Sequence, residues 1–142
     1  MFLGRYSHSV DDKGRLAVPA RFRDELADGV VVTRGFDGCL LLYPAATWAP
    51  LAEKVSALSI GDPDVRLLRR MLFANAVDAQ LDKQGRVLVP GELRTQAGID
   101  REAVVVGMHT FIEVWSPDGW AAQAEAVGRD GAAIAERLAG LV

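Results

Sequence analysis

Two ten-residue segments of this chain place an arginine four residues after an aspartate, with a glycine directly before the arginine. They span residues 10–19 and 81–90, and both read apolar, Asp, two polar residues, Gly, Arg, three apolar residues, Pro. An arginine guanidinium has five donors in a planar fork, which matches a phosphate or the O6 and N7 edge of guanine. A lysine adds charge near the arginine in each segment. The candidate contact residues are Lys13, Arg15, Lys83 and Arg86.

The aspartate and the glycine of each segment are typical of a tight turn between two strands. Aspartate accepts hydrogen bonds from nearby backbone N–H groups, and glycine adopts a positive φ without steric cost. The aspartate can also pair with the arginine across the turn and fix its direction. The residues expected to shape the two turns are Asp11, Gly14, Asp82 and Gly85.

The simplest alternative is that each Asp-x-x-x-Arg turn is only a surface ion pair, which usually contributes about 0–1 kcal/mol. The duplication, with a lysine near the arginine in both copies, favours a binding site instead. The copies also differ, because acidic Asp12 precedes Lys13 in the first turn, whereas neutral Gln84 follows Lys83 in the second. The two turns therefore need not contribute equally.

The duplication extends well beyond the two turns. At an offset of 71 or 72 residues, Leu40 falls on Ile112 and Trp48 on Trp120. Each half reads as a β-hairpin, a short helix, a second β-hairpin and a helix. Because an isolated hairpin is marginally stable in water, the two halves are expected to share one core about a pseudo-two-fold axis.

The expected architecture is α+β, with one repeat over residues 1–60 and a second over residues 61–142, joined by a helix at about 62–73. A final helix opens at Ser116-Pro117, with a break considered between 128 and 131. The expected strands span residues 5–10, 15–18, 30–33, 39–43, 77–81, 86–89, 103–106 and 111–115. The other expected helices span residues 20–26, 44–58 and 90–97.

The composition narrows the classes of function. The chain has 142 residues, half of them hydrophobic, and a formal net charge of −3. A uniformly basic nucleic-acid-binding surface is therefore excluded, although a local basic site on an acidic body is not. The N-terminus lacks the apolar region of a signal peptide, and no apolar run reaches the roughly 20 residues of a membrane span. These features predict a cytoplasmic protein.

No pattern in the sequence indicates an enzyme, a metal or a cofactor. Cys39 is the only cysteine, which excludes a disulfide framework within one chain. His8 and His109 occupy unrelated repeat positions and are interpreted as structural or surface residues. No catalytic triad, phosphate loop or dinucleotide-binding fingerprint is present. We therefore expect no catalytic residue, no small-molecule substrate and no cofactor.

The two turn segments, 11–19 and 82–90, resemble the paired Asp-x-x-x-Arg motifs of the MraZ family. The opening Met-Phe-x-Gly-x-Tyr-x-His of residues 1–8 is similar to the N-termini of that family. The resemblance covers nearly the whole chain. It implies an AbrB/SpoVT-like fold, in which two tandem swapped-hairpin repeats form one pseudo-symmetric, double-psi-like β-barrel with peripheral helices.

The same resemblance implies a bacterial transcription factor associated with the nucleoid. Such a protein binds double-stranded DNA at short direct repeats upstream of its own operon, the cell division and cell wall cluster, and typically represses it. It also forms ring-shaped homo-oligomers. The functional residues implied by position are Asp11, Lys13, Arg15, Asp82, Lys83 and Arg86.

Further basic residues lie near the turns or on helices. Arg21, Arg23 and Arg94 are one short helix away from the turns and are candidates for phosphate contacts. A triplet at Arg66, Arg69 and Arg70 is more typical of a solvated helix face. Trp48 and Trp120 are expected to pack matching helices onto the sheet. The alternative function is a ring-forming protein-interaction or scaffold module that does not read DNA.

Overall fold

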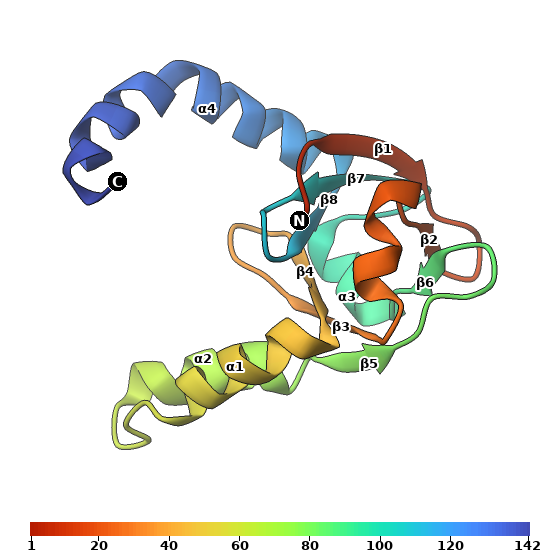
Figure 1. Cartoon of the computed structure of the whole chain (residues 1–142), viewed down its shortest axis with the longest axis horizontal. Coiled ribbons are helices and arrows are strands. Elements are labelled where there is room, and N and C mark those ends of the chain that lie inside the picture. The colour runs from red at the N-terminus through yellow and green to blue at the C-terminus, as the bar shows by residue number, and fades with distance from the viewer.

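Eight antiparallel β-strands form the centre of the molecule in the computed structural model, which describes all 142 residues (Figure 1). Six strands make one sheet in the order β1-β7-β8-β4-β3-β5, and β2 pairs with β6 in a second sheet. With four α-helices around these strands, the predicted α+β class is confirmed. The strands are β1 Arg5–Ser9, β2 Arg15–Ala17, β3 Val30–Arg34, β4 Leu40–Pro44, β5 Val77–Ala79, β6 Arg86–Leu88, β7 Glu102–Gly107 and β8 Ile112–Trp115.

The first strands of the two repeats are exchanged between the repeats. β1 pairs with β7 of the second half, and β5 pairs with β3 of the first half. β2 likewise pairs with β6 rather than with its neighbour β1, and a single isolated bridge between Val10 and Leu16 joins the two arms of the first turn segment. The expected hairpins are therefore of the swapped kind, so that each repeat completes the sheet of the other.

The strand registers define a pseudo-two-fold axis. In the β4–β8 pair, Leu41 lies opposite Glu113, and these two residues correspond to each other at the repeat offset of 72. In the β2–β6 pair, Leu16 lies opposite Val87, which correspond at the offset of 71. In each ladder, the residue pairs on either side of this central pair also correspond to each other at the same offset. The axis therefore passes through both sheets and relates the two turn segments.

The apolar runs of the central strands are explained by burial on both faces of the sheet. In β4, Leu40 and Leu42 lie in the main core, whereas Leu41 and the preceding Cys39 belong to a second cluster on the other face. Successive side chains of a strand point to opposite faces, so a strand covered on both sides has no polar alternation. β7 and β8 are divided between the same two clusters.

The main core is shared by the two repeats. Leu16 of β2 and Val87 of β6 are completely buried there, together with Val32 of β3 and Val105 of β7. Burying such side chains stabilises the fold by about 1.5–3 kcal/mol each. Since residues from both halves contribute to this single core, neither half has a complete core of its own.

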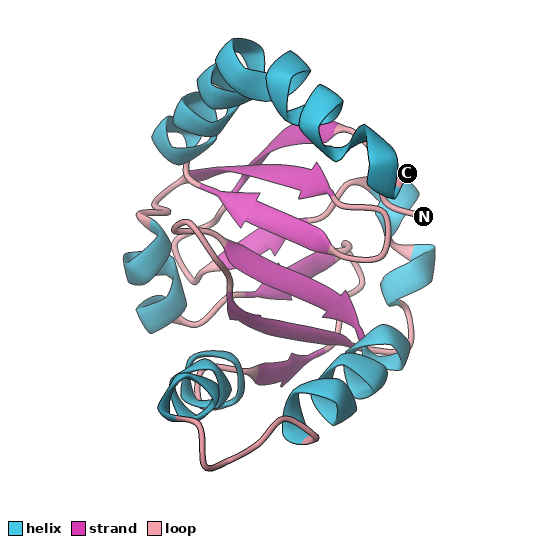
Figure 2. Cartoon of the chain, turned by 90° about the vertical axis from the view of Figure 1, so that its left-hand side faces the viewer, coloured by secondary structure: helices cyan, strands magenta, loops and turns pink.

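The helices lie around the sheets (Figure 2). The carboxylate of Asp62 accepts a hydrogen bond from the N–H of Asp64 at the start of α2, and the Ser116 hydroxyl accepts one from Gly119 at the start of α4. These are ordinary N-terminal caps, each followed by a proline. The helices are α1 Ala45–Ser56, α2 Pro63–Phe73, α3 Gly91–Ala97 and α4 Pro117–Leu138, with short 3-10 helices at Ala20–Phe22, Asp24–Leu26 and Ala139–Leu141.

Two of the expected helices differ in detail. The helix predicted over residues 20–26 is two 3-10 turns, and this tighter winding accompanies the burial of both Phe22 and Leu26 in the core. The final helix continues without a break through Gly128 and Gly131. Alanines surround these glycines, and their strong helix preference offsets the cost of about 1 kcal/mol for each glycine.

Aromatic side chains attach the helices to the outer face of the large sheet. Trp48 of α1 packs edge-on against Tyr43 and Phe73, and Trp120 of α4 lies beside Trp115. The predicted packing role of the two tryptophans is confirmed. After the helical turn that carries Trp120, α4 extends away from the body of the molecule, and it has no buried residue (Figure 1). None of the helices is both long enough and apolar enough to span a membrane.

Candidate nucleic-acid interface

The first turn segment is closed by the side chain of its aspartate. Oδ1 of Asp11 accepts hydrogen bonds from the backbone N–H groups of Lys13 and Arg15, at 3.0 and 2.9 Å. The N–H of Gly14 donates to the Asp11 carbonyl at 3.0 Å, and Gly14 adopts a φ of +85°. The aspartate side chain and the positive φ of the glycine thus close this turn.

The second turn repeats these bonds residue for residue. Oδ1 of Asp82 accepts from the N–H groups of Gln84 and Arg86, both at 2.9 Å. Gly85 donates to the Asp82 carbonyl at 3.0 Å and has a φ of +76°. Because the two turns have the same internal bonding, they present the side chain after each glycine in the same way.

The second oxygen of each aspartate orients the arginine. Nε of Arg15 donates to Oδ2 of Asp11 at 2.6 Å, and Nε of Arg86 donates to Oδ2 of Asp82 at 2.8 Å. Both arginine side chains are about one-third exposed or slightly less. The Nη groups of Arg15 donate no hydrogen bond to the protein. Anchoring through Nε thus leaves the terminal donors of this guanidinium available for a ligand.

The β2–β6 pairing brings the two turn segments together. Arg15 lies opposite Leu88 and Arg86 lies opposite Ala17 in this ladder. Nη1 of Arg86 reaches Oδ2 of Asp11 at 3.4 Å, so the carboxylate of the first turn contacts the arginines of both. The equivalent contact from Arg15 to Asp82 is not made. The pair of turns is therefore close to symmetric, with an additional ion pair on the Asp11 side.

The two turn lysines are exposed and unpaired. Neither Lys13 nor Lys83 forms a salt bridge within the chain, and both residues are exposed in the same turn as an arginine. Two unpaired ammonium groups and two oriented guanidinium groups therefore make a compact basic region on a chain whose net charge is −3.

The carboxylates of the turns remain ionised. Hydrogen bonds from the backbone N–H groups, with the Arg15 N–H contributing most, lower the pKa of Asp11 below its ordinary value, although partial burial opposes this. The Arg86 N–H has the same dominant effect and lowers the pKa of Asp82. Two negative charges therefore lie among the basic groups at neutral pH and hold the arginines by charge-assisted hydrogen bonds.

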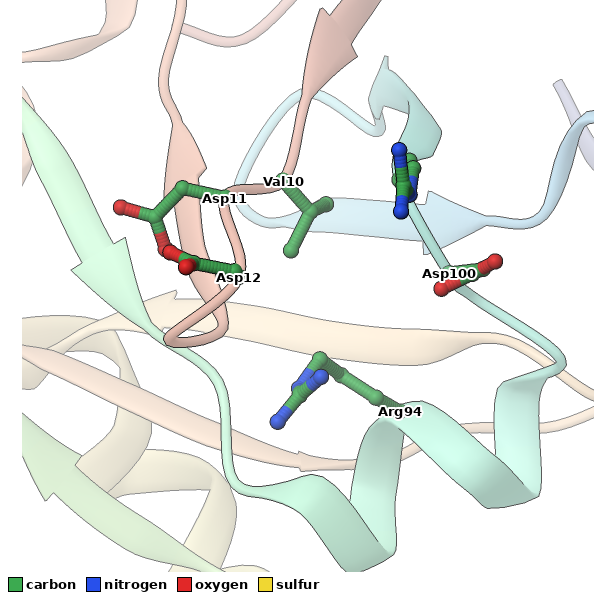
Figure 3. A pocket seen from close by; sticks show the side chains of 6 residues that line it. Val10, Asp11, Asp12, Arg94 and Asp100 are labelled. Atoms are coloured by element: carbon green, nitrogen blue, oxygen red, sulfur yellow. The ribbon is translucent and has the colours of Figure 1, made fainter.

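The three further arginines occupy different environments. Nη1 of Arg21 donates to the Tyr6 hydroxyl at 2.8 Å. Arg23 and Arg94 instead donate through Nε to backbone carbonyls, each at 3.0 Å, and both lie against the turns. Arg94 also lines a surface hollow of about 630 Å³ (Figure 3).

This hollow contains two residues that the sequence did not single out, Asp100 and Arg101. Figure 3 shows Asp11 and Asp12 on one side of it, Arg94 below and Asp100 on the loop after α3. Arg101 is brought there because its carbonyl accepts the N–H of Val10, a long-range contact with no local sequence signal. No group of three or more His, Cys, Asp or Glu side chains is arranged to hold a metal ion.

The family model of the MraZ protein matches residues 1–71 and again residues 72–141, which are the two halves that exchange strands. The chain belongs to the MraZ family. The duplication and the resemblance derived from the turn segments are thereby confirmed, and the Asp-x-x-x-Arg turn is present once in each matched half.

Relatives share the whole length of the chain. A protein named transcriptional regulator MraZ from Thermomicrobium roseum is 59% identical over 142 residues, covering 100% of both chains. Its namesake from Roseiflexus castenholzii is 50% identical over 99% of both chains. The one from Herpetosiphon aurantiacus is 51% identical over 97% of this chain and 96% of its own.

Proposed function

We propose that this chain is a DNA-binding transcriptional regulator that contacts double-stranded DNA through its two Asp-x-x-x-Arg turns. The observation that carries the proposal is the juxtaposition of Arg15 and Arg86 on paired strands, each oriented by an aspartate. The names of the relatives support it, because all three are called transcriptional regulators.

Arginines that are already oriented suit DNA recognition better than basic side chains scattered over a surface. A guanidinium held through Nε is already oriented, so less side-chain entropy is lost when its Nη groups bind a guanine edge or a phosphate. Lys13 and Lys83 add phosphate contacts, which fix the position of the protein on the duplex but carry no sequence information. The acidic remainder of the surface disfavours binding to DNA away from these turns.

The finer function follows from the family resemblance. We propose that the chain represses its own operon, the cell division and cell wall cluster, and acts at the nucleoid in the cytoplasm. Its targets are short direct repeats upstream of the operon, with one pair of turns engaging one repeat. A single compact site gives few phosphate contacts and weak, salt-sensitive binding.

A ring-shaped homo-oligomer would overcome this weakness, because several sites on one assembly would meet several DNA repeats at high effective concentration. The last part of α4 supports self-association. Val127, Ile134 and Leu138 of this helix are exposed by 66, 40 and 43%. Apolar residues displayed in this way on a soluble chain are typical of an interaction surface.

The decisive experiment is a titration of the DNA upstream of the gene with the wild type and with Arg15→Ala. Loss of a guanidinium that reads a base or grips phosphate should weaken binding by about 10- to 100-fold at fixed salt. Arg129→Ala is the matched control, since this exposed arginine on α4 pairs only with its neighbour Asp130. Thermal unfolding should be nearly unchanged in both variants.

Unchanged affinity of Arg15→Ala would remove the turns from the DNA interface. A wild type that does not retard the DNA at all, but binds another protein independently of salt, would instead favour the interaction or scaffold module. The exposed apolar residues of α4 are the observation that favours this second function.

A further inference from the structure

We propose that Arg23 and Arg94 are positioning residues, each of which holds the recognition turn of the opposite repeat, and that phosphate contact is not their main role. This inference rests on the proposed DNA-binding function for its consequence, but not for its structural content. Arg94 follows the second turn along the chain and supports the first. Arg23 follows the first turn and supports the second.

The first observation is the close approach of each guanidinium to a turn glycine. A Cβ atom placed on Gly14 would lie 2.8 Å from Nε and 2.9 Å from Cζ of Arg94. A Cβ placed on Gly85 would overlap Nε and Cζ of Arg23. The glycines are therefore needed for two separate reasons, the positive φ and the space that the arginine of the other repeat occupies.

The second observation is a pair of consecutive hydrogen bonds that connects each arginine to the turn of the opposite repeat. Nε of Arg94 donates to the Val89 carbonyl at 3.0 Å, and the N–H of Val89 donates to the carbonyl of Gly14 at 2.9 Å. Arg94 thus fixes the strand end that is itself bonded to the first turn, while its guanidinium lies against the glycine of that turn.

The pseudo-symmetric copy has the same arrangement. Nε of Arg23 donates to the Val18 carbonyl at 3.0 Å, and the N–H of Val18 donates to the carbonyl of Gly85 at 3.1 Å. The two units recur at the repeat offset with the same donor atom, the same acceptor position and the same glycine. Neither arginine forms an ion pair with a carboxylate, so no ion pair competes with this contact for the direction of these side chains.

This arrangement requires the shape of arginine more than its charge. The Nε donor must point along the side chain to a carbonyl while a flat group fits against a glycine, and lysine offers neither feature. Glutamine keeps the donor without the charge, because its amide nitrogen is attached to Cδ in the position of the arginine Nε, and its planar amide replaces part of the flat surface of the guanidinium. If the guanidinium is lost, each turn is held less firmly, and Arg15 and Arg86 are presented with less orientational precision.

The test compares Arg94→Gln with Arg94→Lys, and Arg23→Gln with Arg23→Lys. The first measurement needs no DNA. It is the hydrogen exchange of the turn amides of Arg15 and Arg86 and of the amides of Val18 and Val89. We expect the lysine variants to exchange these amides about tenfold faster than wild type, while the glutamine variants stay within about threefold, as the loss of local stability predicts.

The second measurement is the salt dependence of binding to the upstream DNA. For the lysine variants we expect affinity to fall about tenfold with an unchanged salt slope, because no phosphate contact is lost. Arg129→Lys is the control, since Arg129 lies on α4 away from the turns and pairs only with its neighbour Asp130. It should leave turn exchange and affinity as in wild type.

Each contrary outcome has a definite meaning. Lysine variants that keep wild-type exchange and affinity, with glutamine variants that lose affinity and lower the salt slope by about one, would show phosphate contact and overturn the positioning role. A wild type that does not bind the DNA would overturn the proposed function alone, because the exchange measurement would still decide how the turns are held.

Discussion

At the scale of single residues, Asp11 connects more of the interface than any other side chain. Its Oδ1 accepts two backbone N–H groups of its own turn, and its Oδ2 accepts Arg15 at 2.6 Å and Arg86 at 3.4 Å. Asp82 holds its own turn and its own arginine only. The inequality between the two turns therefore has a structural basis in the carboxylates as well as in the flanking lysines.

Replacement of Asp11 by asparagine should impair sequence discrimination more than it impairs binding. Asparagine keeps an oxygen for the turn N–H groups but releases two guanidinium groups and removes a negative charge. We expect affinity for unrelated DNA to rise and the ratio of specific to unrelated affinity to fall, more strongly than in the matched variant Asp82→Asn. Competition titrations at fixed salt measure this ratio. An equal effect of both substitutions would mean that the Arg86–Asp11 contact has no role.

The pH dependence follows from the same carboxylates. Their folded-state pKa values are lowered from the ordinary 3.8, so their contribution is complete above that value and is lost as the pH falls through the lowered values. The charge of Asp11 and Asp82, and therefore their hydrogen bonds in the turns, should not change between pH 6 and 8. Carboxyl-carbon NMR titration should give midpoints below 3.8 for these two residues. A midpoint above 3.8 would contradict the bonding described for the turns.

At the scale of the elements, the glycine of each turn can be tested against a glycine that has a similar φ and free space. Gly38 has a φ of +93° and no atom within 4 Å of a Cβ placed on it, whereas Gly14 and Gly85 face arginines. Alanine at Gly38 should therefore cost only the left-handed strain of about 1–2 kcal/mol. Alanine at Gly14 or Gly85 should cost about 1–3 kcal/mol more, because a guanidinium must move.

Urea unfolding of the three alanine variants gives the free-energy differences directly. The two turn variants should also lose DNA affinity, whereas Gly38→Ala should not. If all three lose the same stability, the arginines give way freely and the packing against the turns is unimportant.

The elements also show where reasoning from the sequence succeeds. The strands, the turns and the α+β class follow from local patterns, because β-branched runs, Asp-Gly turn chemistry and proline starts act over a few residues. The duplication follows from the two matching segments. The short helix predicted at 20–26 is present as two 3-10 turns, and the sequence did not indicate this type because the burial of both Phe22 and Leu26 is a tertiary effect.

Long-range contacts mark the point at which such reasoning stops. The contact between Arg94 and the first turn joins residues 80 positions apart, and it exists only because the strands are exchanged. Arg101 reaches the same region through a backbone bond to Val10. Local patterns carry no information on how the two halves are placed relative to each other. The exchange of strands was therefore predicted from the family resemblance and not from periodicity.

At the scale of the whole molecule, α4 lacks the partner helix that α1, its counterpart in the first half, has. In the first half, α1 is accompanied by α2, whereas α4 carries no buried residue and extends from the body (Figure 1). Its apolar positions recur every three or four residues, which is the spacing of a helix that packs along its length on another helix. These positions are Trp120, Ala124, Val127, Gly131, Ile134 and Leu138, and Leu141 of the following 3-10 helix continues the spacing.

A charge on this apolar line of α4 should therefore reduce self-association without unfolding the chain. If the chain assembles through α4 as proposed, Ile134→Asp should shift the mass measured by light scattering toward the 15.3 kDa chain, because a carboxylate would have to be desolvated at the contact. Ala135→Asp adds the same charge about 100° around the helix and is the matched control. It should assemble as wild type does.

The same variants connect assembly to DNA binding. If avidity supplies the affinity, Ile134→Asp should bind DNA with a single direct repeat as well as wild type does, but should lose most of the gain that additional repeats give. Arg15→Ala should instead weaken binding to both kinds of DNA. Equal gains for Ile134→Asp and wild type on DNA with several repeats would separate α4 from assembly, and would leave the strand-exchanged core and its two turns as the whole functional unit.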